Sequence, residues 1–164
     1  MLHKEEIETK QVYENKIYNN DILSLSIGNK SIDVGEPVID LKTKSILKIS
    51  FDQLNDQINN LQYEIIHCNL YWEESDLLEM EYIEGYKVNY IDNVSKSFGT
   101  LNPYVHYEFN IPNENIKLTK SGNYIIRLFD EYEPETSLAT IKFYVTENIM
   151  DVKFNVLETT NFEQ

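Results

Sequence analysis

Short runs of alternating apolar and polar residues, separated by polar turns, follow one another through most of the chain. Alternation with a period of two residues is typical of a strand that buries one face. A succession of such strands at a spacing of roughly 8–15 residues indicates an antiparallel sandwich or barrel. The runs are 22–28, 37–41, 45–54, 61–72, 80–91, 104–111, 122–130 and 138–147, with a further apolar stretch at 150–158.

Helices contribute little to this predicted fold. No helical pattern is long enough to cross over a parallel sheet, so only a helical turn at 55–61 or 75–80 is expected. Residues 1–20 are charged and weakly periodic, and we expect a flexible lead-in there. The pattern therefore predicts an all-β domain, in which Gly85 marks a bend or bulge within the run 80–91.

The charge balance excludes several classes of partner. The chain has 28 Asp and Glu against 14 Lys and Arg, a formal net charge of −14, and a single arginine, Arg127. Such a surface repels nucleic-acid backbones and anionic membranes. No apolar run reaches about 18 residues, so direct membrane insertion is not expected. The opening residues MLHKEEIETK lack the apolar core of a signal peptide.

The longest run, 61–72, carries the only cysteine and the only tryptophan of the chain. Alternation divides it into two faces, with Ile66, Cys68, Leu70 and Trp72 on one and Tyr63, Ile65, His67, Asn69 and Tyr71 on the other. The first face is wholly apolar, so we expect Cys68 and Trp72 to point into the core as structural residues. His67 then points away from Cys68, and no nearby positive charge stabilises a thiolate. This geometry is poor for a nucleophilic pair, and we predict no catalytic residue.

A dense acidic loop follows this run and raises the question of a metal site. Its carboxylates are Glu73, Glu74, Asp76, Glu79, Glu81 and Glu84. A solvated acidic face is the better interpretation, because no DxDxDG pattern of a calcium loop occurs in the chain. The three histidines, His3, His67 and His106, lack the spacing of zinc ligands. We expect no metal and no cofactor, while a glycosidase-type pair of carboxylates stays an open alternative.

The segment TKSGNYIIRLF, residues 119–129, narrows the kind of sandwich. In immunoglobulin-like domains a tyrosine near the start of the sixth strand folds onto the core, and its hydroxyl bonds to the backbone just upstream. Tyr124 fits this structural role, and Ile126 stands where antibody domains place their second cysteine. The alternative interpretation is that Gly-x-Tyr merely follows a β-turn.

Several longer motifs, taken together, resemble one known family. They are FDQL at 51–54, IIHCNLYW at 65–72, SDL at 75–77, EYIEG at 81–85, LNPYVHYEFNIPNEN at 101–115 and SGNYIIRLF at 121–129. Over about residues 21–147 the chain resembles the first domain of the plug protein of the bacterial type IX secretion system, formerly a domain of unknown function. Tyr86 departs mildly from the family's pattern at its position.

The resemblance implies an immunoglobulin-like antiparallel β-sandwich without catalytic activity. It implies a periplasmic protein, associated with the outer membrane, whose partner is a very large outer-membrane β-barrel translocon. The family's protein closes the periplasmic mouth of that barrel while no substrate is in transit. Residues 148–164 then correspond to the truncated start of a following domain or a linker. On its own, we expect the domain to be a monomer.

The residues that contact the partner are a hypothesis at this stage. Aromatic residues dominate interface energetics, and the acidic loop is expected to be exposed. We therefore predict partner binding by Trp72, Glu73, Glu74, Asp76, Glu79 and Tyr82. Two alternatives stay open: a carbohydrate- or ligand-binding sandwich, which needs a row of exposed aromatic rings, and a hydrolase, which needs two close carboxyls in a cleft.

Overall fold

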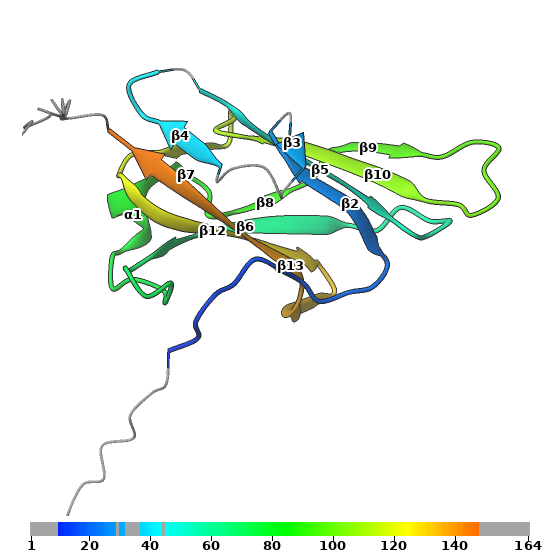
Figure 1. Ribbon diagram of the computed structural model, residues 1–164, viewed down its shortest axis with the longest axis horizontal. Coiled ribbons are helices and arrows are strands. Elements are labelled where there is room, and N and C mark those ends of the chain that lie inside the picture. The colour runs from blue at the N-terminus through cyan, green and yellow to red at the C-terminus, as the bar shows by residue number, and fades with distance from the viewer. Residues whose placement is uncertain (1–9, 29, 32–36, 44, 148–164) are drawn as a thin grey trace, which may run out of the picture.

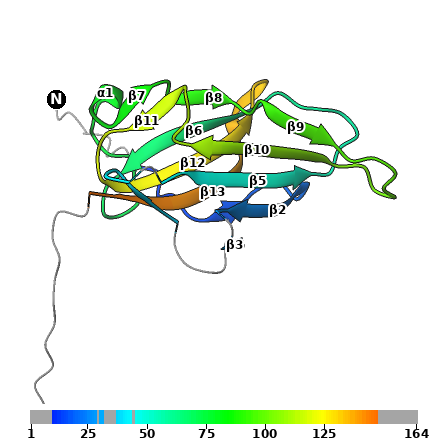
Figure 2. The ribbon, with the colours of Figure 1, turned by 90° about the horizontal axis from the view of Figure 1, so that it is seen from above.

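The fold consists of two sheets of mainly antiparallel strands that pack face to face (Figures 1 and 2). The computed structural model describes residues 10–28, 30–31, 37–43 and 45–147. The predicted all-β sandwich is confirmed. The apolar stretch expected at 150–158, and the following domain or linker expected at 148–164, lie outside the described residues.

The larger sheet is ordered β1 (Lys16–Ile17), β13 (Glu133–Thr146), β12 (Gly122–Asp130), β6 (Leu61–Cys68) and β8 (Val88–Tyr90). Strand β4 (Val38–Asp40) also pairs with β13, and it does so in parallel. The second sheet is ordered β3 (Lys30–Ser31), β2 (Ile22–Ile27), β5 (Leu47–Gln53), β10 (Val105–Ile111) and β9 (Asn93–Lys96). A short pair, β7 (Ile83–Gly85) with β11 (Ile116–Leu118), and one helical turn, α1 (Glu79–Tyr82), complete the described elements.

This strand order is that of an immunoglobulin-like domain. In their order across the sheet, β2, β5, β10 and β9 take the places of the A, B, E and D strands of one sheet. Strands β6, β12 and β13 take the places of C, F and G in the other. The topology thus agrees with the class of sandwich that the segment around Tyr124 predicts.

Aromatic pairs fill the space between the sheets. Tyr63 of β6 stacks on Phe109 of β10 with ring centroids 4.2 Å apart. Phe51 of β5 stacks on Tyr107 of β10 at 5.2 Å. Tyr63, Tyr107 and Phe51 are almost completely buried. Fully burying one such side chain contributes about 1.5–3 kcal/mol, so these pairs are a main source of the sandwich's stability.

The faces of β6 are opposite to the sequence-based prediction. Tyr63 and Ile65 point between the sheets, whereas Ile66 and Cys68 lie in a separate cluster on the outer face of the larger sheet. The prediction rested on the second half of the run, where Ile65, Ile66 and Cys68 place apolar residues on both faces, whereas Gln62 and Glu64 in the first half mark the outer face. Cys68 is nevertheless buried, as predicted, with 3% of its surface exposed.

The outer cluster is covered by residues 10–19, which we call the strap. The strap runs along the larger sheet: Tyr13 is buried over Ile66 and Cys68, and β1 pairs with Thr140 and Ala139 of β13. Further hydrogen bonds run from the Thr140 hydroxyl to the Glu14 carbonyl and from the Lys142 N–H to the Asn15 side chain. Within the lead-in expected at 1–20, the strap thus contacts the larger sheet through the burial of Tyr13 and the pairing of β1 with β13.

The run predicted as one strand at 80–91 is broken into three pieces. Met80 to Tyr82 belong to α1, and β7 and β8 follow on either side of a bend after Gly85. Gly85 has a φ of +113°, and a β-carbon there would lie 2.1 Å from the Asn115 carbonyl oxygen. The bend predicted at this glycine is confirmed. The alternative helical turn expected at 55–61 does not form.

Tyr124 makes the contact that the tyrosine-corner pattern predicts. Its ring is fully buried, and its hydroxyl donates a hydrogen bond of 2.7 Å to the carbonyl of Lys120. The same ring packs against Phe143, with centroids 5.3 Å apart. The hydroxyl thereby fixes the chain that enters β12, and the ring joins that turn to the core.

Replacing Tyr124 by Phe keeps the ring and removes only this hydrogen bond. We expect the free energy of unfolding to fall by about 1–2 kcal/mol in a urea titration. Tyr132→Phe is the matched control, because Tyr132 is 79% exposed at the neighbouring turn and should change stability by less than about 0.5 kcal/mol. Equal stability of the two variants would contradict the role of the Tyr124 hydroxyl.

Candidate functional site

The acidic loop begins with a tight turn organised by one asparagine. The Asn69 side-chain oxygen accepts hydrogen bonds from the N–H groups of Tyr71 at 2.8 Å and Glu73 at 3.2 Å. Its amide donates to the Glu73 carboxylate at 2.9 Å. The turn ends β6 at Cys68, so the strand predicted over 61–72 is four residues shorter than expected. Leu70 and Tyr71 lie exposed on this turn.

Trp72 is half-buried and already occupied by contacts within the domain. Its backbone has a positive φ of 64°, and its carbonyl accepts the Tyr13 N–H at 2.9 Å. The indole meets the Tyr144 ring edge-on at 5.4 Å, and the Lys142 ammonium lies 4.2 Å from the indole centroid. Trp72 packs with the outer cluster rather than between the sheets, which corrects the predicted direction.

Tyr82 is not a surface residue, contrary to the prediction of partner binding. Only 3% of it is exposed, and its ring packs against His67 and Tyr124 at centroid distances of 5.5 and 6.0 Å. The one-turn helix α1 directs this side chain inward. The sequence predicts a strand over residues 80–91, and the alternation of a strand does not predict this direction. Tyr82 therefore belongs to the packing beneath the acidic loop.

The other predicted contact residues lie near the surface but have partners within the domain. Glu73 accepts from Asn69, as described above, and Asp76 forms an ion pair with Lys10 of the strap. Glu79 accepts a hydrogen bond from the Lys87 N–H at 3.2 Å. Glu74, Asp76 and Glu79 are exposed, whereas Glu73 is half-buried. The loop is thus held in place by its own carboxylates.

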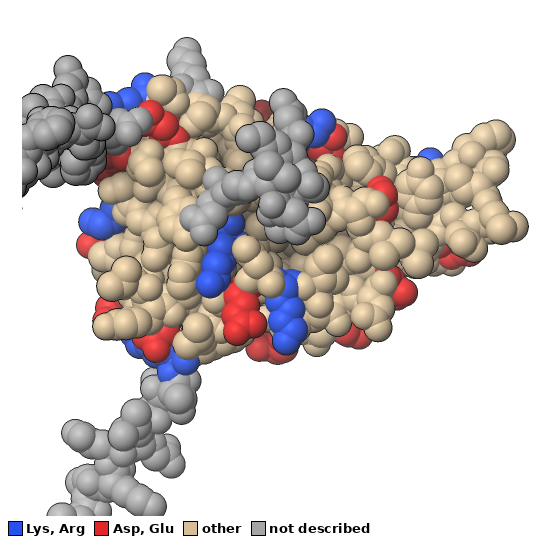
Figure 3. All heavy atoms as spheres, in the orientation of Figure 1, with Lys and Arg blue, Asp and Glu red and all other residues tan. Residues whose placement is uncertain are grey.

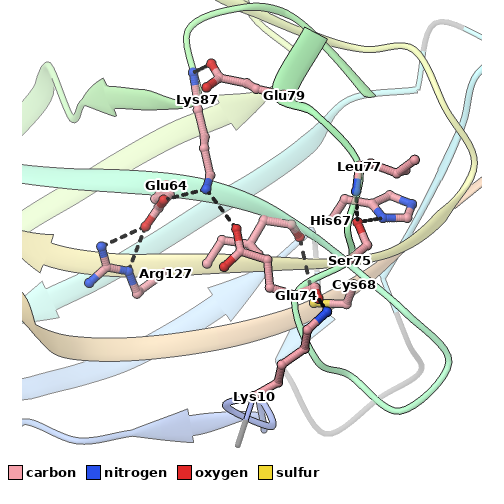
Figure 4. A network of polar contacts seen from close by, with 11 residues as sticks. Lys10, Glu64, His67, Cys68, Glu74, Ser75, Leu77, Glu79, Lys87 and Arg127 are labelled. Carbon is pink, nitrogen blue, oxygen red and sulfur yellow. Dashed lines mark hydrogen bonds and ion pairs between the residues drawn. The ribbon is translucent and has the colours of Figure 1, made fainter. Parts of the chain in front are cut away.

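Lys87 and Arg127 join this loop to the middle of the larger sheet (Figure 4). The Lys87 ammonium lies 3.0 Å from Glu64 and 3.2 Å from Glu74. The Arg127 guanidinium holds the other oxygen of Glu64 at 2.7 Å. Glu64 and Arg127 expose only 14% and 19% of their side chains, so solvent screens this pair weakly.

Burial opposes ionisation of Glu64, but Lys87 and Arg127 outweigh it and hold the pKa of the carboxyl below its usual value. Burial likewise disfavours the charged form of Lys87, yet its contacts with Glu64 raise the pKa of the ammonium overall. Both groups are therefore charged near neutral pH. A network of this kind fixes the loop to the sheet, and its carboxyl is a poor proton donor.

His67 lies beneath the acidic loop and is almost completely enclosed by neighbouring residues. The ring is 8% exposed, its Nδ1 lies 2.8 Å from the Ser75 hydroxyl, and the Tyr124 ring meets it edge-on at 4.9 Å. Its Nε2 has no hydrogen-bond partner among the described residues. Gly122 lies against the ring with a φ of +151°, and a β-carbon there would come within 2.5 Å of Nε2.

Burial lowers the pKa of His67 below its ordinary value of 6.5; the Ser121 backbone opposes this in part, and the charge of Lys120 adds a smaller effect in the same direction as burial. The unfolded chain binds the proton more readily, so this residue's contribution to stability is complete above about pH 6.5 and is lost as the pH falls.

We expect the free energy of unfolding of the wild type to fall between about pH 7 and pH 5 more steeply than that of His67→Gln. The difference in slope is at most about 1.4 kcal/mol per pH unit, the value for one proton. Urea titrations followed by Trp72 fluorescence measure both slopes. Parallel pH profiles for the two proteins would contradict a neutral, buried His67.

Cys68 has the environment of an unreactive thiol. Burial, and to a lesser extent the charge of Glu74, raise the pKa of the thiol to about 12. Tyr13 of the strap covers it, and the predicted separation from the histidine holds, since His67 lies on the opposite face of β6. A nucleophilic role would need the opposite shift in pKa.

We expect an aromatic disulfide reagent to label native Cys68 at least about a thousandfold more slowly than the urea-unfolded chain, because the thiolate is scarce and covered. Tyr13→Ala removes part of the cover and should accelerate native labelling without abolishing the fold. Absorbance of the released thiolate gives the rates. Labelling of the native wild type at the unfolded rate would be the contradictory result.

Metal binding and membrane crossing can be judged only for the described residues. Among them, no group of three or more His, Cys, Asp or Glu side chains is placed to hold a metal ion. Within the same part of the chain, no helix is long and apolar enough to cross a membrane.

One exposed feature escaped the sequence-based prediction. Strands β9 and β10 and the loop 97–104 between them form a hairpin that we call the finger, and it projects from one end of the sandwich (Figures 1 and 2). Phe98 and Leu101 at its tip are 101% and 97% exposed. At the outer end of the finger the surface shows neither Lys or Arg nor Asp or Glu (Figure 3). The signal in the sequence is the absence of acidic residues from 93 to 107.

Comparisons with known proteins identify the family. A crystal structure of a hypothetical protein from Parabacteroides merdae has 28% sequence identity and a TM-score of 0.77, and the match covers 84% of this chain and 35% of that one. The chain therefore spans about a third of the length of that protein. A DNA-bound alkylpurine DNA glycosylase, AlkC, from Pseudomonas fluorescens reaches 15% identity and a TM-score of 0.43 over 76% of this chain and 30% of its own, which is too low to carry an argument.

No curated protein matches the chain. The family described as "Type 9 secretion system plug protein 1st domain" matches residues 22–147. This span contains both sheets except for β1, together with the acidic loop and the finger. The chain therefore belongs to the family of first domains of the type 9 secretion system plug protein.

Proposed function

We propose that this domain is a non-catalytic part of a plug protein that closes the periplasmic side of the outer-membrane type IX translocon. The observation that carries the proposal is the family match over residues 22–147. Because the chain spans about a third of its solved relative, the occluding body would be larger than this domain. The protein would act in the periplasm, associated with the outer membrane through the translocon.

The physical mechanism is binding and steric occlusion. A pore wide enough for folded cargo needs a stopper that does not deform, and two sheets packed face to face, with Tyr63 of one stacked on Phe109 of the other, provide a rigid one. The network of Glu64, Lys87 and Arg127 also fastens the acidic loop to the larger sheet. A loop that is fixed before binding loses little conformational entropy when it docks.

Within this proposal, Glu74, Asp76 and Glu79 are the predicted contact residues that a partner can reach, since they are exposed. Glu73 and Trp72 are half-buried and would mainly support the loop from behind. We do not include Tyr82, because it is buried. An acidic docking surface favours a basic patch on the translocon and gives an association that weakens with salt.

A carbohydrate-binding role draws little support from the described residues. Sugar rings stack on the open face of exposed aromatic side chains, but Lys142 and Tyr144 already contact the indole of Trp72. An open cavity of about 400 Å³ is lined without any aromatic ring, by Ile39, Asp40, Leu41, Thr43, Ser45, Ile46, Pro112, Asn113, Lys117 and Leu118. A hydrolase gains no support from Glu64 either, because a general acid needs a raised pKa and that of Glu64 is lowered.

Co-purification of the intact plug protein with the outer-membrane translocon from a bacterium that uses type IX secretion tests the proposal. We expect association while no substrate is in transit and less association when substrate proteins are overproduced. Glu74→Gln, Asp76→Asn and Glu79→Gln combined should weaken the association most at low salt, since they remove the exposed charges. Absence of association in both secretion states would overturn the proposed function.

A further inference from the structure

The tip of the finger exposes apolar surface that the domain itself does not use. Phe98 and Leu101 do not pack into the core, since almost all of each side chain is exposed to solvent. The hairpin behind them has a continuous antiparallel register, in which β9 pairs with β10 from Val105 opposite Lys96 to Glu108 opposite Asn93. Large apolar side chains presented together at the end of a projecting element mark an interaction site more often than chance exposure does.

The tip is also held in shape by its own polar groups. The Ser97 N–H donates to the Tyr104 carbonyl at 2.9 Å, and the Tyr104 N–H donates to the Ser97 hydroxyl at 2.9 Å. The Thr100 hydroxyl lies 3.0 Å from both the Ser97 hydroxyl and the Asn102 carbonyl. These bonds turn the polar groups of the loop toward one another and leave Phe98 and Leu101 outside. The ordering cost of binding is therefore largely met before a partner arrives.

The charge around the finger indicates what can cover it. The chain carries 28 acidic residues, yet none lies between Asp92 and Glu108. Lys96, at the base of the tip, donates to the Asp56 carbonyl at 2.8 Å. The finger is therefore the part of a strongly acidic protein that can approach a neutral or acidic surface without repulsion.

A lipid surface fits these observations poorly. Two apolar side chains give weak membrane binding unless a cluster of Lys or Arg adds attraction to anionic headgroups. Lys96 is the single lysine between 93 and 107, and the net charge of −14 adds repulsion. A second copy of the chain carries the same net charge, and contact between a fingertip and another part of the copy would propagate into open chains.

We propose that the fingertip inserts Phe98 and Leu101 into an apolar socket, with a neutral or acidic rim, on the translocon. This inference rests on the proposed function and assigns it a second contact, distinct in chemistry from the acidic loop. A few residues that fill a well-packed, fully desolvated pocket supply most of the binding energy of an interface.

The test uses the full-length plug protein in its own bacterium, with a photo-crosslinking phenylalanine analogue at position 98. We expect crosslinks to the translocon from position 98 and none from position 132, where Tyr132 is 79% exposed in an acidic turn. In parallel, Phe98→Ala with Leu101→Ala should weaken binding to purified translocon at least about tenfold. The melting temperature should stay unchanged, because neither side chain is buried.

The outcomes separate this inference from the proposed function. Undiminished binding of the double variant, with no crosslink from position 98, overturns the fingertip contact and leaves the plug function standing. Crosslinks to a second copy of the plug, or flotation of the wild type with anionic vesicles that the double variant loses, likewise overturn it. Failure of the wild type to bind the translocon overturns both proposals together.

Discussion

Strand β6 is buried on both of its faces, and the rest of the domain is arranged around that condition. Its inner face, with Tyr63 and Ile65, packs against the second sheet. Its outer face carries Ile66 and Cys68, which a single sandwich would leave in water. The strap and the turn at Trp72 cover that outer face, so the segment before β2 is needed to complete the fold. Exposure of such a patch would otherwise favour aggregation.

The same condition explains which sequence-based predictions held. In β5 only one face is apolar, so the alternation determines which face is buried. In the turn before Tyr124, the hydroxyl has one backbone partner, the Lys120 carbonyl, so the pattern determines the local structure. For β6 the predicted direction was wrong, because the apolar residues Ile66 and Cys68 lie on the same outer face as the polar Gln62 and Glu64. The inward turn of Tyr82 depends on a single helical turn, and a pattern of four residues is too short to predict it.

Composition locates the acidic loop in the sequence, but it does not reveal the contacts that the loop's carboxylates make within the domain. The acidic loop is exposed, as its composition indicates, but Lys10 of the strap and Lys87 pair with its carboxylates, and Arg127 holds Glu64 of β6 beside Lys87. The partners Lys10 and Asp76, like Arg127 and Glu64, are far apart along the chain, so these pairs leave no mark in the local sequence. Charge density alone is therefore a poor guide to a docking surface: much of the acidic loop is engaged internally, whereas the tip of the finger exposes the apolar Phe98 and Leu101.

The contact between Gly122 and His67 has a consequence for the evolution of this family. A β-carbon at position 122 would lie 2.5 Å from the Nε2 of His67, so the imidazole would have to shift to admit it. The backbone angle at position 122 also disfavours other residues. A relative that loses the glycine would therefore need a compensating change at position 67 or in the packing around it, and we expect the two positions to vary together.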